Sequence, residues 1–75
     1  MKYSITVTDE QGFSNFVYID IKQEQAKKLA TELANEPKYA GRNIFITFYR
    51  PSDGQTGYLN PDGNHTPTGE SWNND

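Results

Sequence analysis

The apolar residues of this chain change their spacing twice, and this change limits the folds that the chain can adopt. Residues 2–8 alternate apolar and polar side chains, and residues 15–21 place β-branched side chains at every second position, which is the period of a strand. From residue 23 to 36 the apolar positions are 26, 29, 30 and 33, the spacing of an amphipathic helix. Residues 43–50 return to alternation and predict the central strand of the sheet.

Turn residues separate these segments. Residues 9–12 end in Gly12, which accepts a positive φ at no steric cost, so the first two strands form a hairpin. Pro37 ends the helix, and Gln25, three residues after Lys22, predicts half of a capping box at its start. Two further turns, at 51–54 and 61–63, lead into strands over residues 56–60 and 64–66, the last one short.

The predicted fold is α+β, with the order β-β-α-β-β. A chain of 75 residues has material for one core only, so we expect a single domain over residues 1–66. The sheet has four strands, or five with the short one, is mainly antiparallel in the order 2-1-3-4, and carries the helix on one face. Residues 67–75 are predicted to form a flexible, polar, acidic tail, because a terminal run with one large apolar residue cannot offset its ordering entropy.

The alternation also predicts which side chains occupy each face of the sheet. The β-branched and aromatic residues expected beneath the helix are Val17, Ile19, Ile21, Ile44, Ile46 and Phe48. The opposite face is then lined by aromatic rings. With Arg50 at its rim, this face supplies the predicted binding residues, namely Phe16, Tyr18, Phe45, Tyr49, Arg50 and Tyr58.

Three interpretations of the aromatic face remain open. In the first, the tail with Trp72, or a second copy of the chain, covers the rings. In the second, the rings anchor a protein partner. In the third, they stack on single-stranded nucleic acid, with Arg42, Arg50 and Lys22 near the phosphates. The net charge of -3 and the lack of a basic patch count against the third interpretation.

The residues that carry chemistry do not form an enzymatic pattern. His65 is the only histidine, there is no cysteine, and the aspartates of the turns suit local backbone bonding. The glycines are scattered at turns and form no phosphate loop. We therefore predict no catalytic residue, no metal site and no cofactor. No apolar run is long enough to span a membrane and no secretory signal begins the chain, so we expect a cytoplasmic protein.

Charge favours one class of function among those that remain. Residues 51–75 hold four acidic side chains and no lysine or arginine. Such a segment suits contact with a basic groove of a partner. The hypothesis is a small non-enzymatic protein-binding module, an inhibitor or regulator of a larger complex, that uses the aromatic face and the acidic tail. A single-stranded nucleic-acid binder is the alternative, and homodimerisation through the aromatic face is a separate expectation.

Overall fold

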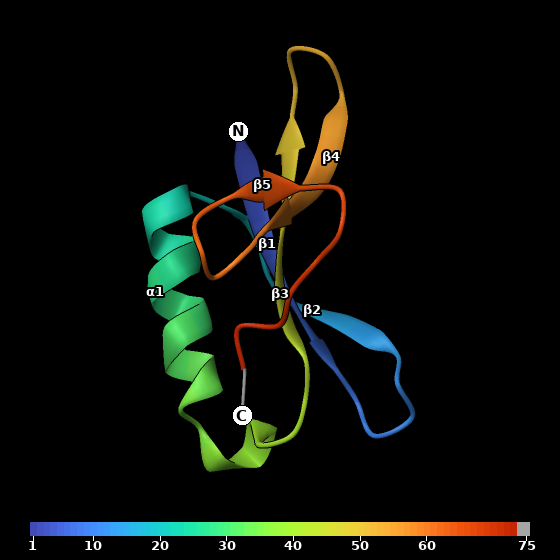
Figure 1. Cartoon of the computed structure of the whole chain (residues 1–75), viewed down its shortest axis with the longest axis vertical. Helices are drawn as coiled ribbons and strands as arrows, with labels where there is room; N and C mark the ends of the chain where they lie inside the picture. Colours follow the sequence, from blue (N-terminus) through green and yellow to red (C-terminus); the bar gives the residue numbers. More distant parts are fainter. Residues whose placement is uncertain (74–75) are drawn as a thin grey trace.

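A computed structural model describes residues 1–73 and confirms the predicted α+β fold (Figure 1). Five antiparallel strands form one sheet in the order β2-β1-β3-β4-β5, so the predicted order 2-1-3-4 is correct and the short fifth strand extends it. The elements in chain order are β1 (Lys2–Thr8), β2 (Ser14–Ile21), α1 (Gln23–Ala34), the 3-10 helix η1 (Pro37–Tyr39), β3 (Ile44–Arg50), β4 (Gln55–Leu59) and β5 (His65–Thr66). No helix within residues 1–73 has the length and apolar character needed to cross a membrane.

The two ends of α1 follow from local chemistry. At the start, the Lys22 N–H donates to the Gln25 side-chain oxygen at 3.2 Å, which is the half capping box that the sequence predicts. At the other end the helix stops at Ala34, two residues before the predicted boundary. Pro37 opens η1, and the residue before a proline avoids the helical region, as Glu36 does with a ψ of 129°.

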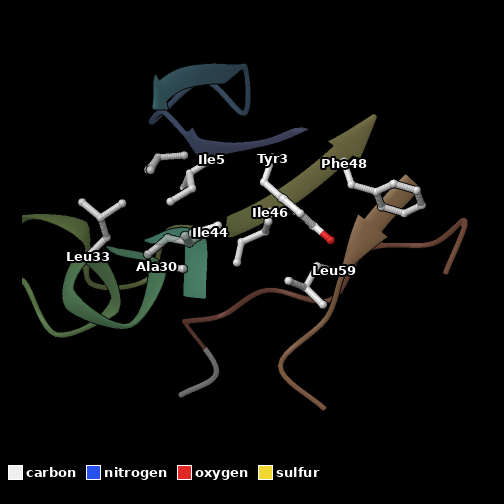
Figure 2. Close-up of a cluster of buried hydrophobic side chains, with 10 residues drawn as sticks. Tyr3, Ile5, Ala30, Leu33, Ile44, Ile46, Phe48 and Leu59 are labelled. Atoms are coloured by element: carbon white, nitrogen blue, oxygen red, sulfur yellow. The ribbon is translucent and has the colours of Figure 1, made fainter. Parts of the chain in front are cut away.

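The core lies between α1 and the two middle strands of the sheet. Tyr3, Ile5 and Val7 of β1 stand opposite Phe48, Ile46 and Ile44 of β3, and all six are buried. The helix contributes small side chains, Ala26 and Ala30, so that it lies close to the sheet, and Leu33 and Leu59 complete the cluster. Phe48 lies at the end of the cluster away from Leu33 and Ala30 of the helix (Figure 2). This end of the core therefore needs cover from another element.

β5 provides this cover. The His65 ring meets the Phe48 ring edge-on, with 5.0 Å between the ring centroids, and its Nε2 lies 2.9 Å from the Tyr3 hydroxyl. The same hydroxyl donates to the Gln23 side-chain oxygen at 3.1 Å. These contacts join β1, α1 and β5, and they give the single histidine a structural position at the edge of the core.

β2 departs from the prediction, because its β-branched residues do not pack beneath the helix. Val17 is 39% exposed and Ile19 64% exposed, whereas Ile21 packs against the core as predicted. The helix rests mainly on β1 and β3, and the β1–β2 hairpin projects away from it (Figure 1). A helix about 10 Å wide covers about two strands spaced by about 4.8 Å, so an edge strand next to that pair stays open.

The C-terminal segment lies against the domain as far as the structure describes it. The Trp72 N–H donates to the Ile44 carbonyl at 2.8 Å, and its indole Nε1–H donates to the Leu59 carbonyl at 2.9 Å. The Asn73 amide donates to the Tyr39 and Arg42 carbonyls. Trp72 therefore docks on the core, a question that the sequence leaves open. The mobility predicted for residues 67–75 stays a prediction. The contacts of residues 71–73 argue against it for those residues. Residues 74–75 lie outside the described part of the chain.

Candidate functional site: the open sheet face and the β2 hairpin

The sheet face opposite α1 carries most of the aromatic residues that the sequence predicts for it. Cross-strand partners in an antiparallel sheet share a face. Thr6 pairs with both Phe16 and Phe45, Thr47 pairs with Ser4 and Tyr58, and Tyr49 pairs with Lys2 and Thr56. Phe16, Phe45, Tyr49 and Tyr58 thus lie on one face, although their role in binding remains a prediction.

A shallow groove of about 610 Å³ runs over this face. Its lining includes small residues, Ser4, Thr47 and Gly57, and aromatic residues such as Phe16 and Tyr49. Lys2 and Asp20 are the charged residues that line it. Within residues 1–73, no three histidine, aspartate or glutamate side chains come together in a way that would hold a metal ion. The groove thus presents aromatic rings, hydroxyl groups and one charged side chain of each sign.

The chain's own C-terminal segment covers one part of the aromatic face. A Cβ atom on Gly69 would lie 2.7 Å from Cδ1 of Tyr58 and 3.0 Å from Cδ1 of Phe45, so the bare backbone rests directly on both rings. The two rings meet edge-on, with centroids 5.8 Å apart, and both are half-buried. The first interpretation of the aromatic face thus accounts for Phe45 and Tyr58.

Buried Asn60 holds this segment in place. Its side-chain oxygen accepts from the Glu70 N–H at 2.9 Å, and its side-chain nitrogen donates to the Thr66 hydroxyl at 2.7 Å and to the Thr68 carbonyl at 3.2 Å. One asparagine therefore connects the end of β4 with β5 and the segment that follows. Because all of these partners lie close to it in the sequence, the segment is anchored locally before it reaches the core at Trp72.

Tyr18 does not join the aromatic face, which corrects the prediction. Thr6 pairs with Phe16 but the adjacent Ile5 pairs with Tyr18, and Tyr3 pairs with Ile21, so β2 contains two irregularities in register. A β-bulge inserts an extra residue and breaks the strict alternation of faces. Tyr18 consequently shares the face of Ile5. At the second irregularity Asp20 has a φ of 54°, and its N–H donates to the Ser4 hydroxyl at 3.4 Å.

Arg50 is not a free cation at the rim of the aromatic face. Its Nε and Nη2 atoms donate to the two carboxylate oxygens of Asp53 at 3.1 and 2.9 Å, and Nη2 also contacts the Gln55 side chain. This hydrogen bonding by Arg50 lowers the pKa of Asp53 below its usual value. The guanidinium group therefore closes the β3–β4 turn. Arg42 is likewise paired, with Glu10 at 3.2 Å.

The β2 hairpin exposes an apolar cluster of which the sequence predicts Phe16 and Tyr18 as binding residues but not Phe13, Val17 and Ile19. Every side chain from Gln11 to Asp20 is exposed. The large apolar ones, which we call the β2 apolar cluster, are Phe13, Phe16, Val17, Tyr18 and Ile19, with exposed fractions of 70%, 64%, 39%, 38% and 64%. One signal in the sequence marks it. Phe13 directly follows the turn glycine, where a large ring has no core to enter.

No family model matches this sequence, and no curated protein or solved structure matches it significantly. The geometry of the hairpin and the groove is therefore the basis for assigning a function.

Proposed function

We propose that this chain is a non-enzymatic protein-binding module whose contact surface is the β2 apolar cluster together with the uncovered rings of the aromatic face, Phe16 and Tyr49. The observation that carries the proposal is the exposure of large apolar side chains along one hairpin. Folded proteins seldom leave so many large apolar side chains of one hairpin in water, and such exposure commonly marks a surface for association. Aromatic residues at its centre are the usual anchors of a protein interface.

Charge supports a partner with a basic rim. Residues 9–21, which include the β2 apolar cluster, carry Asp9, Glu10 and Asp20 and no lysine or arginine. Exposed Asp62 and Glu70 add negative charge near β5. Opposite potentials steer association and suppress wrong partners. A regulator or inhibitor that occupies a basic groove of a larger complex fits this pattern, and a fold without cysteine suits a cytoplasmic location.

Single-stranded nucleic acid is the weaker candidate, because the structure occupies two of the groups that it requires. The backbone of Gly69 lies against the Phe45 ring, which is half-buried, so little of this ring is left for a base. Arg50 is held by Asp53 and Gln55. Stacking proteins need open rings beside unengaged cations. Tyr49 and Lys2 remain in that arrangement, as cross-strand neighbours on the aromatic face.

The test compares capture of partners from source-cell lysate by the intact chain and by a Phe16→Ser, Ile19→Ser double variant, each with and without nuclease. Both side chains are well exposed, so the variant keeps its core and its thermal unfolding midpoint. We expect one protein partner that survives nuclease and is lost in the variant. The matched control is Thr31→Ala, Glu32→Ala on the exposed side of α1, which should capture normally.

Two results would contradict the proposal. Capture that disappears with nuclease would assign the surface to nucleic acid. Equal capture by the intact chain and the double variant would exclude the β2 apolar cluster as the contact surface.

A further inference from the structure

The backbone of β2 points part of its hydrogen-bonding groups away from the sheet. The Thr8 N–H donates to the Asn43 carbonyl at 3.0 Å, so the backbone of Thr8 faces β3. Along a strand this direction alternates, so Thr6 faces β3 as well. Their partners on β2 are Ser14 and Phe16, whose N–H and C=O groups must then point outward. Two residues thus offer two donors and two acceptors at regular spacing along the edge.

Independent contacts on the other side of β3 support this assignment. Ile44 pairs with Val7, whose backbone by the same alternation faces β2 and not β3. The backbone of Ile44 should therefore face away from β1. It does so, because its N–H donates to the Ser71 hydroxyl and its carbonyl accepts from the Trp72 N–H. The direction of the β2 edge therefore follows from hydrogen bonds on both sides of β3.

The usual devices that protect an edge strand are absent from the first half of β2. Proteins blunt such edges with proline, lysine, bulges or a covering segment. Residues 9–21 contain no proline and no lysine. In the described part of the chain β2 pairs with β1 alone. The bulges begin only after Phe16, so they limit the regular edge to its first residues without closing it.

The charges at both ends of the hairpin disfavour a second copy as the occupant of this edge. Two β2 strands paired about a twofold axis must join outward-facing residues, and the register that uses both outward residues of each copy places Ser14 opposite Phe16. This register brings Asp20 of each copy toward Glu10 and Asp9 of the other. Like charges opposite each other destabilise a strand pair. Lysine or arginine at these places would instead complement Asp20 and Asp9, whereas the Glu10 carboxylate already pairs with Arg42 at 3.2 Å.

We propose that the outer edge of β2 at Ser14–Phe16 accepts an extended segment of the partner protein as a sixth strand. The segment has apolar side chains at alternate positions, which lie on one face and contact Phe16 there, and it has lysine or arginine at its ends. Main-chain hydrogen bonds supply affinity in such strand addition, and alternate side chains supply specificity. The inference rests on the proposed function and specifies the chemistry of its partner.

The experiment titrates the ¹⁵N-labelled protein with a capped synthetic peptide, Lys-Val-Thr-Val-Thr-Val-Lys, while amide shifts are recorded. We expect shifts centred on residues 13–17. Ser14→Pro removes an outward donor and no bond to β1, so it should weaken binding by about tenfold or more, equivalent to about 1.4 kcal/mol. Ser14→Ala keeps the donor and should bind within about twofold of the intact chain.

Two altered peptides make the test independent of any protein variant. N-methylation of the central valine removes a peptide donor, and glutamate at both ends reverses the charge. Each peptide should bind about tenfold more weakly or worse at low salt. Failure of the parent peptide to shift residues 13–17, or equal binding by the N-methylated peptide, would overturn strand addition. Equal binding by the glutamate peptide would overturn the requirement for basic ends.

Analytical sedimentation tests whether a second copy of the chain occupies the β2 edge instead. A concentration-dependent dimer that Ser14→Pro abolishes would assign the edge to a second copy and overturn the proposal. The proposed function fails in a distinguishable way. If the peptides fail while the Phe16→Ser, Ile19→Ser variant still loses its partner, the side chains bind and the backbone edge does not.

Discussion

At the residue scale, Tyr3 combines burial with hydrogen bonds that fix its hydroxyl group. The hydroxyl donates to Gln23, and His65 Nε2 lies 2.9 Å away. We expect Tyr3→Phe to lower the free energy of unfolding at neutral pH by about 1 kcal/mol, the usual net contribution of one such bond. Urea unfolding at pH 7 measures the change. Tyr18→Phe, on a partly exposed ring, is the control and should unfold like the intact chain.

The same residue makes stability depend on alkaline pH. Burial raises the pKa of Tyr3 above the ordinary value of 10.0, because the folded state favours the neutral phenol. A raised pKa gives stability that is complete below the unfolded value and decreases as pH rises through the folded value. Tyr3→Phe should therefore lose less stability than the intact chain between about pH 9 and pH 11. Parallel loss in both proteins would show that Tyr3 does not titrate with unfolding.

Asp9 has the opposite pH dependence. The N–H of Phe13 lowers the pKa of its carboxyl group, and the Asn15 side chain and the Gln11 N–H assist, because all three donate to the charged form. A lowered pKa gives stability that is present above the unfolded value near 3.8 and is lost as pH falls through the folded value.

We therefore expect Asp9→Asn to flatten the decline of the unfolding midpoint below about pH 4, as followed by circular dichroism. Glu10→Gln in the same turn is the matched control and should retain the decline. If the unfolding midpoint of Asp9→Asn still declined steeply below about pH 4, a group other than Asp9 would cause the loss of stability in acid.

At the element scale, the β3–β4–β5 part of the sheet depends on the absence of a side chain at Gly57. A Cβ atom there would lie 2.8 Å from Cε1 of Phe48 and 2.8 Å from the Thr66 carbonyl oxygen. The second of these atoms belongs to the backbone, so β5 would have to shift. We expect Gly57→Ala to cost about 1–3 kcal/mol, as overpacking does, in chemical unfolding.

The effect of Gly57→Ala should be local to β5. Amide exchange of His65 and Thr66 should accelerate more than that of β1. The control is Thr56→Ala on the adjacent exposed position, which should leave both rates unchanged. Uniform acceleration over the whole sheet would contradict a local displacement of β5.

Also at the element scale, the sequence predicts correctly the elements in which one regular apolar period determines the buried face. The apolar spacing at Ala26, Ala30 and Leu33 gives the helix, and the alternation from Ile44 to Phe48 gives the central strand, because both faces of each are set by one regular period. β2 is different. Its period is also regular in the sequence, but bulges break it at Val17 and Asp20, and the helix covers only the neighbouring pair of strands. The spacing of apolar residues predicts neither the bulges nor the number of strands that the helix covers.

The same distinction separates the site residues that the sequence predicts correctly from those that it does not. Phe45, Tyr49 and Tyr58 share the predicted face because β1, β3 and β4 pair without a bulge, and Phe16 shares it because it precedes the first bulge of β2. Tyr18 changes face at a bulge, and Arg50 is bound by a turn aspartate three residues away. The exposure of Val17 and Ile19 could not be predicted, because it depends on how far the helix reaches across the sheet.

At the scale of the whole molecule, the C-terminal segment completes the core. Trp72 packs against the buried cluster and bonds to Ile44 and Leu59, two residues from neighbouring strands. Ser71 and Trp72 hydrogen-bond to the backbone of Ile44, at the part of the β3 edge that β4 does not reach. Without them these backbone groups would face water. Composition alone predicts a mobile tail here, whereas the contacts predict that residues 71–73 contribute to stability.

Two shortened or altered chains decide between these expectations. We expect Trp72→Ala to lower the free energy of unfolding by about 2 kcal/mol, less than the 3–5 kcal/mol range for fully buried rings, because Trp72 is half-buried. A chain that ends at Pro67 should lose more, since it also uncovers Phe45 and Tyr58 and so enlarges the exposed aromatic face. A chain that ends at Asn73 is the control and should unfold like the intact protein.

Urea unfolding followed by circular dichroism compares the four proteins on one scale, and Trp72 fluorescence reports docking directly in the intact chain. A blue-shifted emission that moves to the red in the same transition as the backbone signal would show that the segment unfolds together with the domain. If the chain ending at Pro67 were as stable as the intact protein, residues 68–73 would contribute nothing to the core. The aromatic face would then be available over its whole width, and Phe45 and Tyr58 would return to the set of residues that a partner could contact.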